Sequence, residues 1–226
     1  AYQISSSLVG SEMCIRDSVI GSASFYEGLD ELKIKPGIKR FEGEVSINNQ
    51  NVTKNKKKIK VPKNSIIETG ELSNLMFVDA KDAFLLRSNT ILKIKHHKNK
   101  KRIIGFEVIK GGVLSVFSKK KRKIRTPSAL IGIRGTGVYI EVDNEKTYVC
   151  TCYGKAILQR KDDLDIKEVV KTSHHDEPRY IYLNNNNIEK APVINHSDLE
   201  LIMLEEQVLR KPPFVGKDGK VKAGYY

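Results

Sequence analysis

The alternation of apolar and polar residues is the feature that most restricts the fold of this chain. From Phe41 onward, apolar side chains recur at every second position, as in "FEGEVSINNQNV", "ILKIKHHK" and "ALIGIRGTGVYIEV". A period of two places one set of side chains on one face of a strand and the other set on the opposite face. The pattern therefore predicts β-strands through most of the chain.

Turn-forming residues separate these runs about every eight to twelve positions. The cluster "NNQN", the break "DAKD" and the pair Gly111-Gly112 each predict a reversal between two strands. No helical pattern is interleaved between the strands, which argues against an α/β sheet. We expect an all-β fold, a β-sandwich or β-roll of short antiparallel strands.

One helix is predicted, near the C-terminus, over residues 197–210. Ser197 and Glu200 have the spacing of a capping box, and Pro212 and Pro213 end the helix. Its apolar residues cover a wide arc, so we expect burial on more than one side or contact with another subunit. The final residues, "VGKDGKVKAGYY", are predicted to form a flexible tail.

The first residues do not share the strand pattern. The stretch Ser5–Ser18, "SSSLVGSEMCIRDS", resembles translated sequencing-adaptor sequence, and we predict that residues 1–18 are an artefact and disordered. Residues 19–36 follow, with the small-residue string "SAS", and are interpreted as a signal-peptide remnant or linker. Residues 37–160 then form the predicted β domain, and residues 161–226 an extension that carries the helix and tail.

The chain is strongly basic. Its 226 residues carry a formal net charge of +13, with a pI of about 9.5. Three lysine-rich segments, 54–60, 93–102 and 119–125, are predicted to be loops between strands. They could contact an anionic polymer or a membrane surface, but no aromatic residues are interleaved with them, so nucleic acid is not the preferred partner.

The glycine-rich string "IGIRGTG" lies between two predicted strands. It lacks the strand-turn-helix context of a dinucleotide site and the Gly-Lys-Ser/Thr of a phosphate-binding loop. We interpret it as a tight turn or bulge that holds Arg134, with Arg134, Gly135 and Thr136 as candidate binding residues. A purely structural kink is the alternative.

Two cysteines offer the clearest candidate chemistry. Cys150 and Cys152 are two positions apart on a predicted strand, so their thiols point to the same face. With His174, His175 and His196 downstream, they could ligate a soft metal ion or haem. A redox pair and simple core filling are alternatives. No catalytic triad or hydrolase motif can be assembled, and we expect the protein not to be an enzyme.

Residues 37–158 resemble the FecR domain family of bacterial envelope domains. The likeness is carried by "FEGEVSINNQNV", by "VPKNSIIETGELSNLMFVDAKDAFLLRSNTILKI", by "KIRTPSALIGIRGTGVYIEV" and by "CYGKAIL". The resemblance implies an all-β periplasmic domain without catalysis. The segments "SHHDEPRYI" and "INHSDLELIMLEEQVLRKPPF" resemble the extension of a stand-alone subgroup. Neither a membrane helix nor a cytoplasmic anti-sigma region is recognisable.

Three functions follow as hypotheses. The first is an exported, non-enzymatic FecR-like module for envelope signalling or scaffolding, with a protein partner in the envelope and a periplasmic or otherwise exported location. The second is a metal- or haem-responsive sensor that uses the cysteine pair and the downstream histidines. The third is a basic surface that binds nucleic acid or another anionic polymer, for which binding would weaken steeply with salt.

Overall fold

The computed structural model describes residues 33–53, 59–99, 102–184, 187–216, 218, 220 and 221. The chain divides into two compact units, Lys33–Phe214 and the pair of segments Ala1–Leu32 and Val215–Tyr226. In the second unit, the described residues include a β-bridge between Val215 and Val221. The predicted artefact, most of the predicted linker and the lysines of 54–58 lie outside the described residues.

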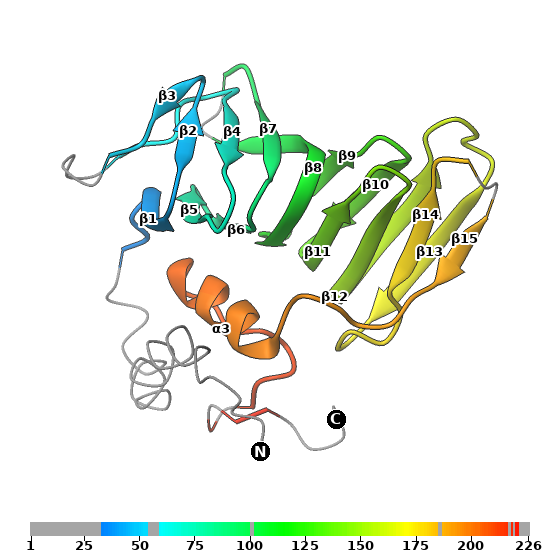
Figure 1. Ribbon diagram of the computed structural model, residues 1–226. Helices are drawn as coiled ribbons and strands as arrows, with labels where there is room; N and C mark the ends of the chain where they lie inside the picture. The colour runs from blue at the N-terminus through cyan, green and yellow to red at the C-terminus, as the bar shows by residue number, and fades with distance from the viewer. Residues whose placement is uncertain are drawn as a thin grey trace, which may run out of the picture. The chain divides into compact units, whose positions relative to one another are not determined.

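The prediction of an all-β fold is confirmed (Figure 1). The described residues form fifteen strands and a single helix, α3 (Asp198–Gln207), which is far too short and polar to cross a bilayer. The strands are β1 (Gly37–Glu42), β2 (Val45–Ile47), β3 (Gln50–Asn51), β4 (Ile66–Thr69), β5 (Asn74–Asp79), β6 (Asp82–Leu86), β7 (Ile91–His96), β8 (Ile103–Val116), β9 (Lys121–Arg125), β10 (Ala129–Arg134), β11 (Gly137–Val142), β12 (Lys146–Arg160), β13 (Lys167–Thr172), β14 (Arg179–Tyr182) and β15 (Ile188–Lys190).

Two sheets share their longest strands. Sheet A has the order β1-β5-β6-β8-β11-β12-β14-β15, and sheet B has the order β3-β2-β4-β7-β8-β9-β10-β12-β13. All neighbours are antiparallel except β8 and β9, which are parallel. The predicted hairpins at "NNQN" and "DAKD" form as β2–β3 and β5–β6, with positive φ at Asn48, Asn49 and Ala80.

Strands β8 and β12 each pass from one sheet to the other at a glycine. Gly111 in β8 and Gly154 in β12 have φ of +80° and +96°, values at which other residues are strained. The prediction that Gly111-Gly112 is a turn between two strands is wrong, because the chain bends there within one strand and continues. These bends close the two sheets over a shared core.

The core lies between the sheets. Alternate residues of both sheets meet there, including four phenylalanine rings whose centroids lie 4.7–5.8 Å apart. A buried ion pair joins Arg122 of β9 to Asp82 of β6, with Nη2–Oδ2 at 2.6 Å. The outward face of sheet A is covered in turn by α3, which packs against β6 and β8.

The predicted helix is confirmed with a shorter extent. It begins after Ser197, whose side chain and that of Glu200 form the expected capping box, but it ends at Gln207 rather than at Arg210. Leu201 and Leu204 are buried, whereas Leu199 is 49% exposed, so the apolar arc is buried less widely than predicted.

The prediction that the lysine-rich segments are loops is wrong in part for two of them, because, of the described residues, only 97–99 and 102 of the second segment and 119–120 of the third lie between strands. Lys121–Arg125 forms β9, and Lys93 and Lys95 belong to β7. Their charged side chains alternate with buried residues and are exposed on one face of sheet B.

Candidate metal centre

Cys150 and Cys152 lie on the sheet A half of β12, on the face that points away from the main core. Val149 belongs to the main core, and the two cysteines, at alternate positions, face the opposite side, as predicted. Both are free thiols and both are fully buried. The C-terminal extension covers them.

His175 reaches the cysteines from the loop between β13 and β14. The carboxylate of Asp176 accepts hydrogen bonds from the hydroxyl of Thr172 and the backbone N–H of His174, which tightens the loop. The backbone N–H of His175 donates to the carbonyl of Cys152 at 2.9 Å, and its φ of +50° turns the side chain onto the sheet.

His196 lies in the segment that connects β15 to α3, residues 191–197, which we call the strap. The Tyr148 hydroxyl fastens the strap to sheet A, because it donates to the carbonyl of Pro192 and accepts from the N–H of Ile194. The ring of His196 stacks on Tyr139, with centroids 4.8 Å apart. The strap thus presents this imidazole directly to the cysteine pair.

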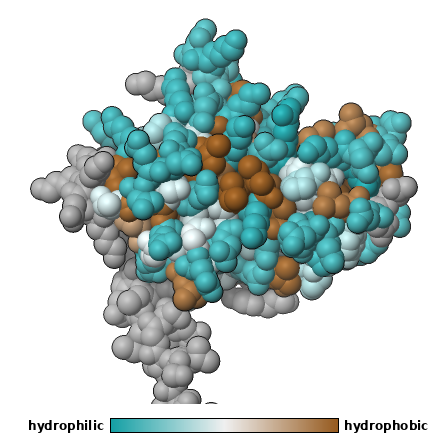
Figure 2. Space-filling view, turned by 45° about the horizontal axis from the view of Figure 1, so that its top comes forward, coloured by the Kyte–Doolittle hydropathy of each residue, from teal (hydrophilic) through white to brown (hydrophobic). Residues whose placement is uncertain are grey.

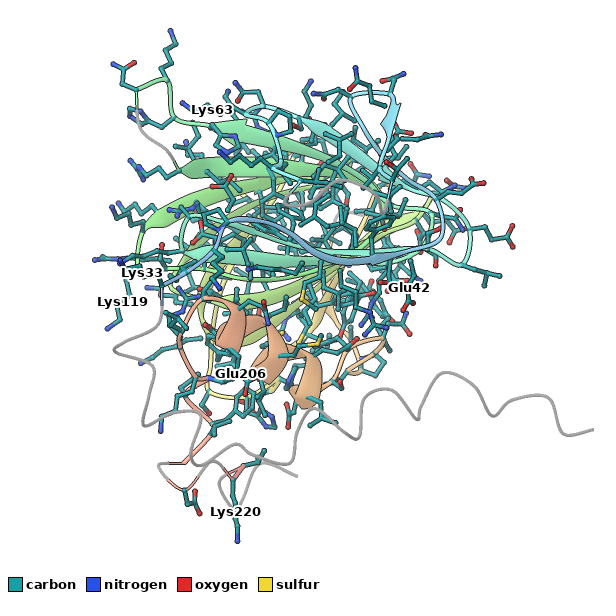
Figure 3. The ribbon with its side chains drawn as sticks, turned by 90° about the vertical axis from the view of Figure 1, so that its left-hand side faces the viewer. Lys33, Glu42, Lys63, Lys119, Glu206 and Lys220 are labelled. Carbon is teal, nitrogen blue, oxygen red and sulfur yellow. The ribbon has the colours of Figure 1, made fainter. Side chains whose placement is uncertain are left out.

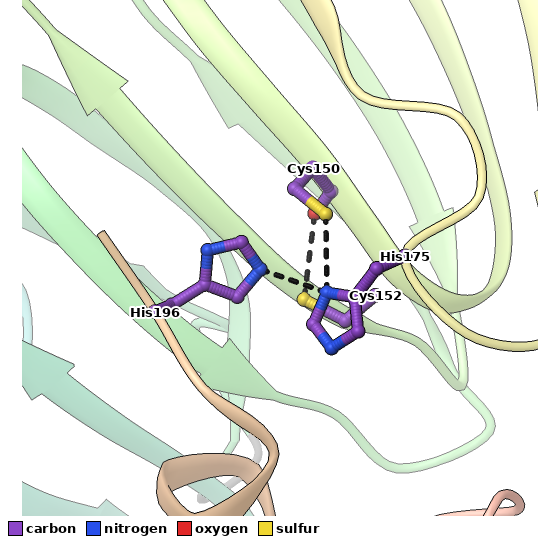
Figure 4. Close-up of side chains that lie close together, drawn as sticks. All are labelled: Cys150, Cys152, His175 and His196. Atoms are coloured by element: carbon purple, nitrogen blue, oxygen red, sulfur yellow. Dashed lines mark hydrogen bonds between the residues drawn. The ribbon is translucent and has the colours of Figure 1, made fainter. Parts of the chain in front are cut away.

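These four side chains form one cluster (Figure 4). The ligand atoms of Cys150, Cys152, His175 and His196 all lie within 4.8 Å of one another. His175 Nδ1 is 3.4 Å from Cys150 Sγ and 2.9 Å from His196 Nε2. A tetrahedral zinc ion needs ligand atoms about 3.3–3.8 Å apart, so the cluster is within small side-chain movements of a Cys₂His₂ site.

The outer nitrogens of both imidazoles are bonded to groups that only accept hydrogen bonds. His196 Nδ1 is 2.6 Å from the carbonyl of Ile194, and His175 Nε2 is 3.1 Å from Asp198 Oδ1. Each outer nitrogen must therefore carry the hydrogen, which leaves the inner nitrogens of the neutral rings as two lone-pair donors 2.9 Å apart. Two such atoms this close need a proton or a metal ion between them. Outer nitrogens held by a carboxylate or a carbonyl are typical of metal-ligating histidines.

The electrostatics of the cluster favour a thiolate at Cys150. The Cys152 thiol beside it lowers the pKa of Cys150, and the two histidines lower it further against the effect of burial, to about 4. Burial and the neighbouring Cys150 raise the pKa of Cys152. Burial would lower the pKa of His175, but the bonds to Asp198 and Cys150 outweigh it and raise the pKa to about 9. In the cluster without a metal ion, these shifts favour a thiolate at Cys150 beside a protonated His175.

His174 does not join the cysteines, although the sequence made it a candidate ligand. Its Nε2 lies 2.7 Å from Asp198 Oδ1, the same oxygen that His175 approaches, and these three residues form a second group that shares His175 with the first. Asp198, the first residue of α3, was missed by sequence reasoning. Its only sequence signal is its place directly after the helix-capping Ser197.

Arg134, Gly135 and Thr136 lie at a bend between β10 and β11, as predicted. Gly135 has a φ of +62°, and the buried Thr136 hydroxyl donates to the carbonyl of Lys155 at 3.2 Å. Because β10 belongs to sheet B and β11 to sheet A, the bend carries the chain from one sheet to the other. Arg134 is exposed and is not part of the cluster formed by the two cysteines, His175 and His196.

Comparisons with known proteins place few limits on function. No protein-family model matches the chain, and no curated protein matches it. Among solved structures, two crystal structures of a candidate anti-sigma factor from Parabacteroides distasonis ATCC 8503 are similar to it. The identities are 14% and 13%, the TM-score is 0.46 for both, and each match covers 56% of this chain and 58% of the other. The match therefore spans little more than half of that protein.

Proposed function

We propose that this chain is a non-enzymatic β domain that binds one soft transition-metal ion, Zn²⁺ or Cu⁺, through Cys150, Cys152, His175 and His196. The observation that carries the proposal is the pair of inward-facing imidazole nitrogens, 2.9 Å apart, beside two buried sulfurs. Thiolate and imidazole ligands together favour these ions over hard cations such as Mg²⁺. Haem is disfavoured, because haem takes at most two axial ligands from the protein and four converge here.

A binding role is favoured over catalysis by the ligand count. Four protein ligands complete a tetrahedral shell and leave no position for a substrate or for an activated water, which is the pattern of structural and regulatory sites. The proposal is therefore a metal-responsive domain rather than a metalloenzyme.

The setting we propose is envelope signalling in an exported protein, with a protein partner. The support is the FecR-like sequence pattern, together with a site that joins three separate segments of the chain. Metal binding would also protect two free thiols in an oxidising compartment, where unpaired cysteines are unusual.

Metal content of the purified chain tests the proposal. We expect about one equivalent of zinc by elemental mass spectrometry after reconstitution and desalting. Replacement by Co²⁺ should give the charge-transfer and ligand-field absorption of a tetrahedral thiolate site. Cys152→Ser and His196→Ala should each lose both signals. The matched control is His97→Asn, since His97 lies outside the cluster. A wild-type chain that retains no metal would refute the proposal.

A further inference from the structure

Most charged side chains on the outward face of sheet B are positive. The exposed positions of β7 are Lys93 and Lys95, and those of β9 are Lys121, Lys123 and Arg125. Among the described outward positions of β7 to β10, β12 and β13, Glu107 is the one acidic residue. We call this surface the cationic face. Figure 2 shows a largely hydrophilic surface that several hydrophobic patches interrupt. In Figure 3, the labelled Lys33, Lys63 and Lys119, which are not part of the cationic face, lie along one side of the molecule.

Four cations form a row across neighbouring strands. Lys121 of β9 is directly opposite Arg134 of β10, and Lys155 of β12 is directly opposite Lys171 of β13. Ile133 of β10 is directly opposite Ala156 of β12. Arg134 follows Ile133 and Lys155 precedes Ala156 on the antiparallel strand, so the two cation pairs lie in one row. None of the four forms an ion pair with another described residue.

This arrangement opposes folding. Like charges directly opposite on adjacent strands are destabilising, and the sequence places two such pairs side by side. Solubility alone would be served by alternating signs. A row that lowers stability within the domain is consistent with a surface that an anionic partner neutralises.

An exposed apolar pair lies next to the row. Ile157 of β12 is directly opposite Val169 of β13, and they are 40% and 55% exposed. Gly132 of β10 lies between Ile157 and Lys123, so Lys123 is in the same row of the sheet as the apolar pair. Arg125 and Lys167 lie in the neighbouring row. The apolar pair therefore has cations on both sides.

We propose that the cationic face docks on a bilayer surface that contains acidic phospholipids. Lysines would contact the headgroup phosphates, and Ile157 and Val169 would enter the interfacial region. Lysine predominates over arginine, which suits diffuse attraction to a charged surface better than fixed bidentate contacts to single phosphates. The described face has no aromatic residue on which nucleic-acid bases could stack. This surface is on the sheet B side and does not depend on the metal cluster.

Vesicle sedimentation of the full chain tests the proposal. We expect binding to vesicles of phosphatidylcholine with phosphatidylglycerol, no binding to pure phosphatidylcholine, and weaker binding as salt rises. Lys155→Gln/Lys171→Gln should weaken the partition coefficient by about fivefold per lysine. The same variant should be at least as thermally stable as wild type, because it removes a like-charge pair. The matched control Lys81→Gln/Lys190→Gln changes two exposed lysines that lie outside the row.

A second variant separates lipid from other polyanions. Ile157→Ser/Val169→Ser keeps every charge and should weaken vesicle binding by at least about threefold, since both side chains contribute apolar contact. Binding of a labelled DNA duplex is measured in parallel. The proposal is overturned if acidic vesicles do not bind, if the serine variant binds them as wild type does, or if the duplex binds as tightly as the vesicles.

Discussion

At the scale of single residues, Gly154 separates the half of β12 that belongs to sheet A from the half that belongs to sheet B. The four residues before it include the cysteine pair in sheet A, and the residues after it hold Ile157 on the outward face of sheet B. Its φ of +96° makes the bend possible. A Cβ at this position would lie 2.8 Å from the carbonyl oxygen of Gly135, at the neighbouring bend between the sheets. The two bends therefore pack against each other without space for a side chain.

We predict that Gly154→Ala lowers the free energy of unfolding by about 2–3 kcal/mol, because backbone strain adds to the steric conflict. Gly132→Ala is the matched control. Gly132 is also a strand glycine, but its Cβ would meet nothing closer than Ile157 Cβ at 4.0 Å. That substitution should be neutral or stabilising by up to about 1 kcal/mol. Urea denaturation measures both, and equal midpoints for the two variants would contradict the assignment of the bend.

At the scale of elements, an ion pair fixes the N-terminus of α3 to the β6–β7 turn. Arg87 donates to both carboxylate oxygens of Glu200, at 2.6 and 2.8 Å, and to the carbonyl of Asn195 in the strap, at 2.7 Å. Burial opposes ionisation of Glu200, but the bonds from Arg87 and Ser197 outweigh it and lower its pKa. The contact therefore positions the strap, and with it His196, as well as the helix.

This lowered pKa predicts an acid-sensitive contribution to stability. The contribution of Glu200 is fully present above the pKa of an unfolded glutamate, about 4.3, and is lost as pH falls through the lower folded pKa. At pH 7, Glu200→Gln should be less stable than wild type by about 1 kcal/mol, a value discounted for partial exposure. The difference should shrink as pH falls below about 4.3 and through the folded pKa. Glu145→Gln, at an exposed turn, is the control and should show no such trend. A constant difference between pH 7 and pH 3 would contradict the role of Glu200.

At the scale of the whole molecule, alternation predicted the strand content but not the pairing of the sheets. Gly111 resembles a turn in the sequence, and only the structure shows one strand that continues into the second sheet. Strand β9 was missed because its sequence shows little alternation of apolar and polar residues. Arg122, which points inward, is as charged as its exposed neighbours. Its burial depends on Asp82, forty residues away, and such a partner cannot be found by local pattern.

The grouping of the cysteines with histidines was predicted only in part, for the same reason. The spacing of Cys150 and Cys152 fixes a shared face within one strand, and local geometry is enough to establish this. Which histidine reaches that face depends on the positive φ of His175 and on the position of the strap. Both are properties of loops, so the exclusion of His174 and the support from Asp198 could not be predicted from spacing.

The cluster joins three segments that are far apart in sequence, so metal binding should stabilise the whole domain and the strap most of all. A ligand at one hundred times its Kd contributes about 2.7 kcal/mol, which corresponds to a rise in Tm of about 5–10 °C for a domain of this size. We predict this rise when Zn²⁺ is added, its reversal by chelator and its absence in Cys152→Ser.

Hydrogen exchange should slow across the strap and α3, residues 191–207, when the metal ion binds. The β5–β6 hairpin, which contributes no ligand, serves as the internal reference. If a fully loaded protein shows unchanged exchange in 191–207, the metal does not couple the C-terminal extension to the sheets, even if the ion binds.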